Sequence, residues 1–384
     1  MKRAVVVGSG IAGLTTALRL GQDGWGVTVL ERASARRSGG YMLNLLGMGF
    51  TAAERLGLLP ALSERAFDLF DSVMVREDGQ VKLMMPATFA QGALGPRTMT
   101  VFRSDLESAL FAAASEYAEF RFGTTVSAVE QDADRVRVAL SDGTSHEADL
   151  LIGADGVQSA TRTAVFGADY RVDMPYMVAA FPIGAVSDVP EQSAATFIGP
   201  GRTAGVVNLG PERSSAFFTY GCADPALELA RGPVDALRGS FGDLAAGVPD
   251  AIRHLEKDPS IVYFDRVSKV VAPAWSKGRV VLVGDAAWCV TLFAGHGASL
   301  ALAGADQLGA GLLKHGDDVA AALAEWEAGL RPEVTKRQAH ARRGAAYYVP
   351  PSRFHVRMYE LMTRTMMLPG IRGLAQRGIK RQTS

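Results

Sequence analysis

The chain of 384 residues is long enough for one large domain or two closely joined domains. Forty basic and forty acidic residues give a formal net charge of zero, so no whole-protein field would draw the chain to nucleic acid or to an anionic membrane. This balance favours a small-molecule partner. The two cysteines, Cys222 and Cys289, have neither metal-ligand spacing nor a disulfide framework, which predicts a cytoplasmic protein without a metal site.

The N-terminus resembles a secretory signal peptide, because Lys2 and Arg3 precede an apolar run of small residues. Glycines at positions 8, 10 and 13 would interrupt a signal helix, so we expect this segment to belong to the fold. No apolar run approaches the roughly 20 residues that a membrane-spanning helix needs.

A strand, a glycine-rich turn, a helix and a second strand follow one another within residues 4–31, which is typical of a dinucleotide-binding βαβ unit. In a GxGxxG turn the first glycine permits the tight turn, the second lets the backbone approach a pyrophosphate, and the third allows close helix packing. We expect Glu31, at the end of the second strand, to bind an adenosine ribose. NAD and FAD share the ADP half, so this unit alone does not separate them. The turn consists of Gly8, Ser9, Gly10, Ile11, Ala12 and Gly13.

Short helices and strands are expected in the next part of the chain. A helix over 52–59 ends at Pro60, two strands flank a turn at 77–80, and a helix begins near Arg103. Further strands are expected over 124–129, 136–140 and 150–152. From about 170 to 270, short apolar runs with glycine-bearing turns predict a mostly antiparallel sheet inserted in the nucleotide fold.

The last part of the chain returns to the nucleotide fold. Residues 279–283 predict a buried parallel strand, and a helix over 319–330 is expected to end just before Pro332. A methionine-bearing helix over 352–367 is expected to stop near Pro369. Packing between the domains is its expected role, and binding of a partner is the alternative.

Three separated motifs can now be compared with known families. They are GSGIAG at 8–13 with ER at 31–32, GADGVQSATR at 153–162, and GDAA at 284–287 with GHGA at 295–298. Together they resemble the single-component FAD-dependent aromatic hydroxylases typified by para-hydroxybenzoate hydroxylase, especially the tetracycline-inactivating and polyketide-tailoring branch. The resemblance spans nearly the whole chain.

This resemblance implies an α/β protein with a Rossmann-type FAD-binding fold, glutathione reductase-like, an inserted mostly antiparallel β-sheet substrate domain and a C-terminal helix. The expected division assigns residues 1–70, 101–168 and 273–345 to the FAD-binding domain, 71–100 and 169–272 to the substrate domain, and 346–384 to a C-terminal helical segment.

The resemblance also implies roles for individual residues. Glu31 and Arg32 would hold the adenosine ribose, Arg103 would reach the phosphate or ribityl region, Asp155 is associated with FAD and reduced nicotinamide, and Asp285 would accept a hydrogen bond from the ribityl chain. Backbone amides at the helix start near residue 297 would stabilise negative charge on the reduced flavin. The further implied cofactor positions are Arg37, Gly40, Val126, Gly295, Gly297, Ala298 and Ser299.

The reaction that the resemblance implies is hydroxylation. NADPH or NADH reduces the flavin, molecular oxygen adds at its C4a carbon, and the hydroperoxide transfers a hydroxyl group to an electron-rich substrate. The leading hypothesis is therefore an FAD- and NAD(P)H-dependent monooxygenase, a monomer or homodimer, acting on a bulky aromatic or polyketide-like molecule. The alternatives are an FAD-linked reductase or dehydrogenase without oxygen insertion, and a non-catalytic carrier with a flavin fold. Candidate pocket walls are Tyr41, Phe181, Phe197, Phe217, Tyr220 and Phe293.

The third motif departs from the family pattern at two positions. Trp288 stands where the family commonly has His, and Leu292 stands where it has Pro, which would free a loop beside the flavin. His296 replaces a common Gln and is a candidate acid or base, with a hydrogen-bonding role in the loop as the alternative. Cys289 is expected to be a small buried thiol without a covalent flavin link.

Overall fold

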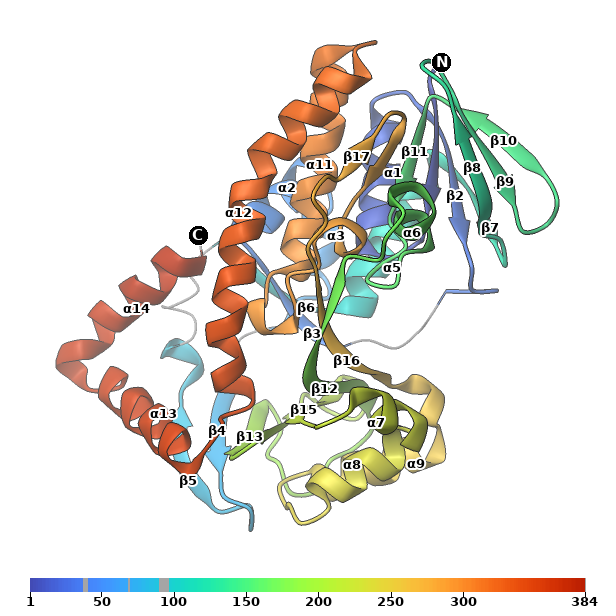
Figure 1. The fold of residues 1–384 in the computed structure, drawn as a ribbon. Coiled ribbons are helices and arrows are strands. Elements are labelled where there is room, and N and C mark those ends of the chain that lie inside the picture. The colour runs from blue at the N-terminus through green and yellow to red at the C-terminus, as the bar shows by residue number, and fades with distance from the viewer. Residues whose placement is uncertain (37–40, 68–69, 90–96, 384) are drawn as a thin grey trace.

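The computed structural model describes residues 1–384 except 37–40, 68–69, 90–96 and 384. A six-stranded sheet and a seven-stranded sheet lie at opposite ends of the molecule, and the long helix α12 (Val319–Tyr348) runs beside both (Figure 1). In the part of the chain that the structure describes, no helix is long and apolar enough to cross a membrane.

The six-stranded sheet is the Rossmann-type core. Its order is β17-β18-β11-β1-β2-β7, and all neighbours are parallel except β17 and β18. The inner strands β1, β2, β11 and β18 are short and rich in buried Val, Leu and Ile, as expected for strands covered on both faces, whereas the edge strands β7 and β17 contain none of these residues. The strands are β1 (Arg3–Val7), β2 (Gly26–Glu31), β7 (Ala118–Phe122), β11 (Leu150–Gly153), β17 (Ser276–Lys277) and β18 (Val280–Leu282).

Helices cover one face of this sheet and a small antiparallel sheet covers the other. The helical side holds α1 (Ile11–Gln22), α5 (Arg103–Ala114) and α11 (Gly297–His315), whose apolar residues share one buried cluster with β1 and β2. The small sheet consists of β8 (Val126–Gln131), β9 (Val136–Leu140) and β10 (Ser145–Ala148). The remaining elements of this part are β3 (Met42–Leu46), β6 (Thr98–Phe102), α2 (Gly47–Arg55), α3 (Leu59–Ser63), α6 (Ala160–Phe166), α10 (Asp285–Trp288) and the 3₁₀ turn η2 (Leu292–Ala294).

The seven-stranded sheet has the order β16-β12-β15-β14-β13-β4-β5, and only β13 and β4 pair in parallel. The prediction of a mostly antiparallel inserted sheet is confirmed. Its strands are β4 (Asp71–Val75), β5 (Val81–Met85), β12 (Arg171–Ile183), β13 (Ser193–Gly199), β14 (Arg202–Asn208), β15 (Ser214–Gly221) and β16 (Tyr263–Val270). The helices that cover the outer face of this sheet were not predicted from the sequence. They are α7 (Pro225–Arg231), α8 (Pro233–Phe241), α9 (Val248–Lys257) and the 3₁₀ turn η1 (Pro259–Ile261).

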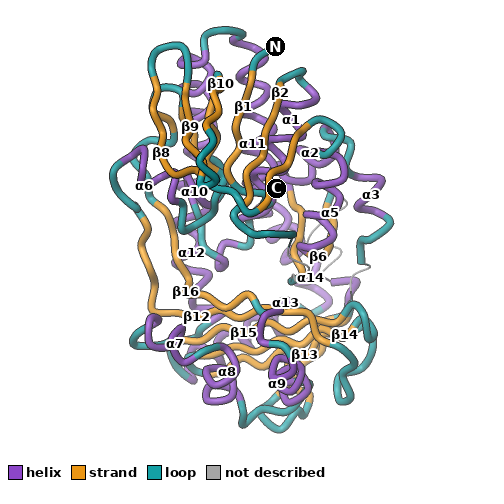
Figure 2. The backbone as a smooth tube through the Cα atoms, turned by 90° about the vertical axis from the view of Figure 1, so that its right-hand side faces the viewer, coloured by secondary structure: helices purple, strands orange, loops and turns teal. Residues whose placement is uncertain are grey.

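Strand alternation gives this sheet two different faces. Residues such as Phe181, Ala204 and Phe218 form a buried cluster with the outer helices α8 and α9. Residues on the other face, such as Val178 and Phe217, pack with the end of α12. In Figure 2 this inner face is turned toward the six-stranded sheet.

Of the two helices predicted to end near a proline, the one before Pro332 is predicted wrongly. The helix from Val319 continues through Pro332 to Tyr348. Proline removes one helical hydrogen bond, but Leu330 and Val334 are both buried in the core on either side of it, so packing holds the helix together. The helix predicted over 352–367 is confirmed as α13 (Arg353–Met366). A further helix that was not predicted, α14 (Pro369–Thr383), begins at Pro369, because proline suits the first position of a helix.

Candidate flavin site

The glycine-rich turn after β1 has three glycines with three different surroundings. Gly8 has φ +105°, and a Cβ there would lie 2.5 Å from the carbonyl oxygen of Ala154. A Cβ at Gly13 would lie 1.9 Å from the carbonyl oxygen of Gly8. Gly10, by contrast, would place a Cβ in open space, and it precedes α1 without any side-chain cap. The turn thus presents bare backbone and unpaired helix N–H groups on one open side, which suits a pyrophosphate.

Glu31 lies beside this turn at the end of β2. Its carboxylate accepts hydrogen bonds from the backbone N–H and hydroxyl of Ser9, at 2.9 and 2.8 Å, and from the N–H of Ala33 at 2.8 Å. These bonds fix the carboxylate next to the turn where an adenosine ribose is expected. Arg32 is exposed.

The segment before Val126 also reaches the end of β2, since the N–H of Thr124 donates to the carbonyl of Glu31 at 3.0 Å. Val126 begins β8 and is partly buried against the small sheet. Arg37 and Gly40 lie outside the described residues.

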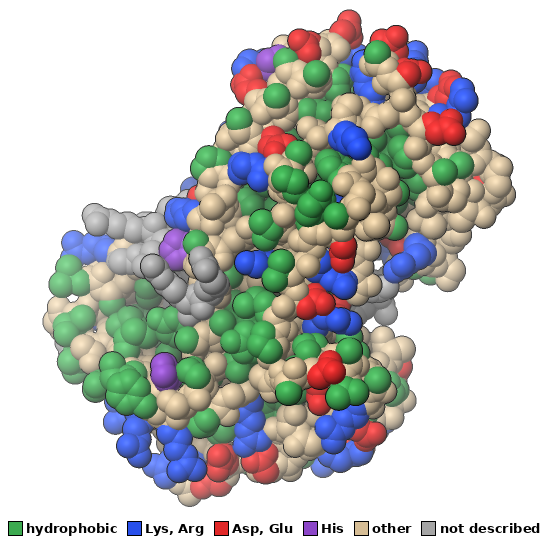
Figure 3. All heavy atoms as spheres, in the orientation of Figure 1, with side chains coloured by type: hydrophobic (Ala, Val, Ile, Leu, Met, Phe, Trp, Pro, Cys, Tyr) green, Lys and Arg blue, Asp and Glu red, His purple; other side chains and the backbone are tan. Residues whose placement is uncertain are grey.

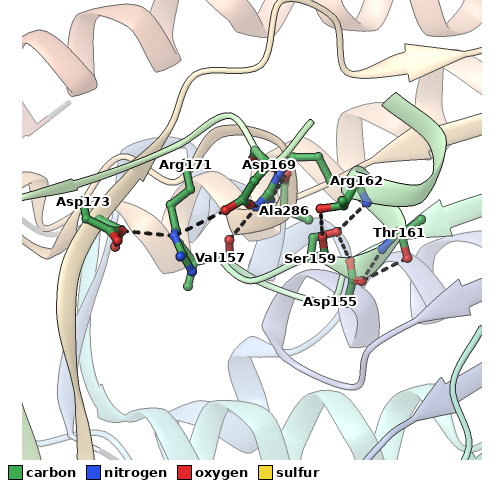
Figure 4. Close-up of polar contacts among 11 residues, drawn as sticks. Asp155, Val157, Ser159, Thr161, Arg162, Asp169, Arg171, Asp173 and Ala286 are labelled. Atoms are coloured by element: carbon green, nitrogen blue, oxygen red, sulfur yellow. Dashed lines mark hydrogen bonds and ion pairs between the residues drawn. The ribbon is translucent and has the colours of Figure 1, made fainter. Parts of the chain in front are cut away.

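Asp155 of the second motif is engaged within its own turn (Figure 4). One carboxylate oxygen accepts from the Ser159 hydroxyl, and the other accepts from the N–H and hydroxyl of Thr161 at 2.9 and 3.0 Å. Ser159 in turn caps α6 by accepting from the N–H of Arg162. The carboxylate therefore shapes the turn that packs against Gly8, and this geometry favours a structural role over direct contact with a nucleotide.

Arg162, also in the second motif, is fully buried and joins this motif to the third (Figure 4). Its guanidinium donates to the carbonyl of Ala286 at 2.8 Å and to the carbonyl of Val157 at 2.7 Å. It also pairs with Asp169. A buried charge requires such partners, so Arg162 fixes the distance between the two turns.

The third motif packs directly on the first. Gly284 has φ +62°, and a Cβ there would lie 2.6 Å from the Cβ of Ala12. The next residue, Asp285, is accessible to solvent although protein surrounds it, as is expected of a side chain in an open recess. Burial raises the pKa of the Asp285 carboxyl, and the charge of Arg103 opposes that rise.

Arg103 and two tyrosines lie near Asp285. The backbone N–H of Arg103 donates to the carbonyl of Tyr41 at 2.9 Å, and its guanidinium lies 5.8 Å from the Tyr41 ring. The rings of Tyr41 and Tyr263 have centroids 6.1 Å apart. Burial raises the pKa of Tyr263, so its phenol stays neutral at neutral pH. Tyr263, from β16 of the inserted sheet, was missed in the sequence because no motif surrounds it.

The start of α11 provides a second uncapped helix N-terminus. A Cβ at Gly295 or Gly297 would meet nothing within 4 Å, and no side chain caps the helix. The hydroxyl of Ser299 accepts from the N–H of Leu46 at 3.2 Å, so it ties α11 to β3. Ala298 is partly buried against the main core. The open amides can stabilise negative charge, as the sequence predicts.

The loop before α11 is braced by α12. Thr291 has φ +71°, a strained conformation for a β-branched residue. A Cβ at Gly344 of α12 would lie 2.5 Å from the carbonyl oxygen of Phe293, and the rings of Phe293 and Tyr348 have centroids 5.4 Å apart. The loop is therefore held although Leu292 replaces the proline of the family pattern.

Gln338 of α12 supports the same region from behind. Its side-chain amide donates to the carbonyl of Val270 at 2.7 Å and lies 3.4 and 3.3 Å from the carbonyls of Trp288 and Cys289. No motif in the sequence points to Gln338, because the predicted helix ends at residue 330, before this position.

Trp288 faces the core instead of the flavin region. It is buried and clusters with Trp275 and Trp326, at centroid distances of 4.6 and 5.8 Å. A Cβ at Gly304 would lie 2.8 Å from the Trp288 ring, so α11 has a glycine where the indole rests. Cys289 is a buried thiol that donates to the carbonyl of Ser268.

His296 is turned toward α12. Its Nδ1 contacts the carbonyl of Ala294, and its buried Nε2 has no hydrogen-bond partner among the described residues. Burial lowers the pKa of His296, while nearby Arg337 and Lys336 lower it further and Glu333 opposes them. A neutral imidazole facing a helix does not favour the predicted role as acid or base.

The predicted pocket aromatics divide between the two faces of the sheet. Phe181, Phe197 and Tyr220 are buried in the cluster under α8 and α9, so their assignment to a pocket wall is corrected. The reason is strand alternation, since residues one position apart point to opposite faces. Phe217 and Phe293 lie on the inner side, in the cluster with Tyr348 and Val178.

These residues fit an FAD molecule. The bare backbone at Gly10 and at Gly295 and Gly297, where a Cβ would meet nothing, leaves two open helix N-termini. The first would hold the pyrophosphate, and the second would hold the flavin ring, with Asp285 and Arg103 between them. FAD supplies the redox chemistry when bound.

Comparison with known proteins agrees with this geometry. Residues 2–323 match the FAD binding domain family, so the chain belongs to that family. FAD-dependent monooxygenase asL4 of Sarocladium schorii is 30% identical over 404 residues, covering 95% of this chain and 92% of that protein.

Two solved structures are similar over nearly their whole length. Tetracycline destructase Tet(51) has a TM-score of 0.81 at 22% identity, covering 100% of this chain and 97% of that one. Klebsiella pneumoniae HpxO complexed with FAD and uric acid has a TM-score of 0.78 at 25% identity, covering 98% and 96%. The predictions of the FAD-binding fold, of FAD as cofactor and of an FAD-dependent monooxygenase resembling the aromatic hydroxylases are confirmed.

Proposed function

We propose that this monooxygenase uses NADPH or NADH to reduce FAD and hydroxylates a bulky, uncharged aromatic or polyketide-like compound through a flavin C4a-hydroperoxide. The FAD site supports the first half of this proposal. The inner face of the seven-stranded sheet supports the choice of substrate.

The observation that carries the proposal is the chemistry of this inner face. Strand register puts one row of side chains across the middle of the sheet, and the row contains no charged residue. Its members are Met74, Thr196, Gly205, Phe217, Ala180 and Tyr263. The adjacent rows are Ala194, Val207, Ser215 and Pro182 on one side, and Ile198, Thr203, Thr219, Val178 and Asp265 on the other.

No Arg or Lys stands in these three rows, so they provide no cation for a substrate carboxylate. The small residues Gly205 and Ala180 flank Phe217, which gives a flat apolar surface beside an aromatic ring. A broad ring system fits such a surface better than a small aromatic acid, which would need a buried cation. Tyr263 places this row near Tyr41 and Arg103 of the flavin site.

The reductase alternative was based on a free loop at Leu292. That loop is held by the contacts of Phe293 with Gly344 and Tyr348, and this weakens the reason to expect chemistry without oxygen insertion.

The experiment compares the FAD-loaded protein with its Gly205→Val variant. A Cβ at Gly205 would meet only the Phe217 carbonyl and the Thr196 hydroxyl, both at 3.9 Å, so the variant folds but fills the surface. Substrate-stimulated NADPH and NADH oxidation is measured over a panel of aromatic polyketides and small aromatic acids, with mass analysis of products formed under labelled oxygen. Stopped-flow absorbance after mixing reduced enzyme with oxygen detects the hydroperoxide.

We expect one labelled oxygen atom in a polyketide-type product, and a KM that rises about tenfold or more in Gly205→Val with FAD content unchanged. Reaction only with small aromatic acids would contradict the substrate class. Oxidation of substrate without labelled oxygen would support the reductase, and the absence of any stimulated NADPH or NADH oxidation would support the carrier.

A further inference from the structure

The C-terminal helices α13 and α14 carry an apolar surface that nothing in the described chain covers. Seven large side chains, six on these helices and one in the turn between them, are between 37% and 67% exposed. They are Phe354, Met358, Leu361, Met362, Leu368, Ile371 and Leu374. In Figure 3 hydrophobic side chains gather at the lower left, in the region where Figure 1 places α13.

On α13 most of the large apolar side chains are exposed and point away from the protein. Val356 and Thr363 are buried, and Val356 packs with Met74 and Ile198 of the inserted sheet. Phe354, Met358 and Leu361 follow the i, i+4, i+7 spacing of one helix face, which lies opposite that buried side. A surface helix of a globular protein normally turns its apolar face to the core. Most of the large apolar side chains of the predicted methionine-bearing helix, including Met358 and Met362, are therefore exposed instead of packed between the domains.

The same segment is strongly basic. Residues 352–384 contain seven Arg or Lys and one Glu, whereas the whole chain has a net charge of zero. The single acid, Glu360, pairs with Lys82 of β5 at 2.8 Å. Arg353, Arg357 and Arg364 are exposed along one edge of the apolar face and have no acidic partner among the described residues.

We propose that the outer face of α13, continued by α14, docks on an anionic lipid bilayer. A basic amphipathic helix with large apolar residues lies in the plane of the membrane interface, where its side chains enter the lipid and its arginines meet the headgroups. This local excess of positive charge is not visible in the net charge of the whole chain, which is zero. A second copy of the chain fits the surface less well, because a two-fold contact would bring the two basic edges together.

This position has a consequence for access to the substrate sheet. Val356 of α13 contacts Met74, which belongs to the row on the inner face of that sheet. The docked face and the substrate row thus lie on opposite sides of one helix. An apolar compound dissolved in the bilayer would reach the protein at this edge.

Vesicle flotation of the FAD-loaded full-length protein tests the proposal. The vesicles are phosphatidylglycerol mixed with phosphatidylcholine, or phosphatidylcholine alone, at low and high salt. Leu361→Glu and Met358→Glu place a charge on the outer face, and Arg357→Gln with Arg364→Gln removes two cations. Leu313→Glu is the matched control, because Leu313 is equally exposed but lies on α11. Melting temperature and flavin absorbance check that each variant is folded.

We expect binding to phosphatidylglycerol vesicles that weakens with salt, falls about tenfold or more in either Glu variant on α13, and falls about fivefold for each arginine removed. Leu313→Glu should bind like the original protein. Three outcomes would overturn the proposal: no flotation of the original protein, equal loss in Leu313→Glu, or a concentration-dependent dimer in light scattering that Leu361→Glu abolishes while vesicle binding is absent.

Discussion

The flavin site and the inserted sheet are built on different principles. At the flavin site three turns from distant parts of the chain pack closely at glycines: Gly8 lies against the backbone of Ala154, and Gly284 lies against the Cβ of Ala12. On the inserted sheet, specificity depends on which face a side chain occupies, and Phe181 and Phe217 occupy opposite faces. Close backbone contact requires glycine at fixed spacing, so the first kind of site is visible in a sequence. The second depends on strand register, which is not visible.

The largest expected effect tests the backbone contacts of the flavin site. Gly13→Ala puts a Cβ 1.9 Å from the Gly8 carbonyl oxygen, and we expect no stable FAD-bound protein. Gly10→Ala is the matched control, because its Cβ meets nothing in the chain. It should keep its Tm as apoprotein and lose FAD affinity about tenfold or more, measured by fluorescence titration. Unchanged FAD affinity in Gly10→Ala would show that the cofactor does not approach this side of the turn.

The next effect concerns the link between the second and third turns. Arg162→Met leaves the carbonyls of Ala286 and Val157 without their buried donor and removes one of the cations that pair with Asp169, and we expect a loss of about 3–5 kcal/mol in the free energy of unfolding measured with urea. Arg171→Met removes a partly exposed cation that pairs with Asp169 and Asp173, and should cost about 1 kcal/mol or less. Equal losses of unfolding free energy in the two variants would show that the buried Arg162 contributes no more to stability than the partly exposed Arg171.

A third experiment separates the two faces of the inserted sheet. Phe181→Leu should lower the free energy of unfolding by about 1 kcal/mol and leave KM unchanged, because Phe181 packs under the outer helices. Phe217→Leu should change stability less and raise KM several-fold, because Phe217 lies on the inner face. Steady-state kinetics and urea unfolding are measured on both variants. A rise in KM for Phe181→Leu would contradict the assignment of substrate binding to the inner face alone.

The smallest effect is expected at His296. Burial lowers its pKa from the ordinary 6.5, so the unfolded chain binds this proton at a higher pH than the folded chain. The stability that depends on neutral His296 is complete above pH 6.5 and is lost as the pH falls toward the lowered pKa. His296→Gln should flatten the fall of Tm between pH 6.5 and about 5, whereas the exposed His340→Gln should not. A large loss of activity in His296→Gln at neutral pH would instead restore a catalytic role.

The sequence predicted the elements that are set by local pattern and glycine spacing. The βαβ unit, the strand at 280–282 and the acidic residue Asp285 after it are where the motifs place them. The course of α12 could not be predicted, since burial on both sides of Pro332 overrides the local rule. Arg162 stood inside a recognised motif, but its role depends on reaching Ala286, more than 120 positions away in the chain.

The unbroken helix α12 has a consequence for substrate size. Its 30 residues span about 45 Å, with Leu330 and Val334 anchored in the flavin-side core and Ala341 and Ala345 packed near the inserted sheet. Such a helix is a rigid spacer between the six-stranded sheet and the seven-stranded sheet. For the proposed substrate, which would lie between the flavin and the sheet, we therefore expect substitutions that bend α12 to change the substrate range although they lie far from any pocket wall.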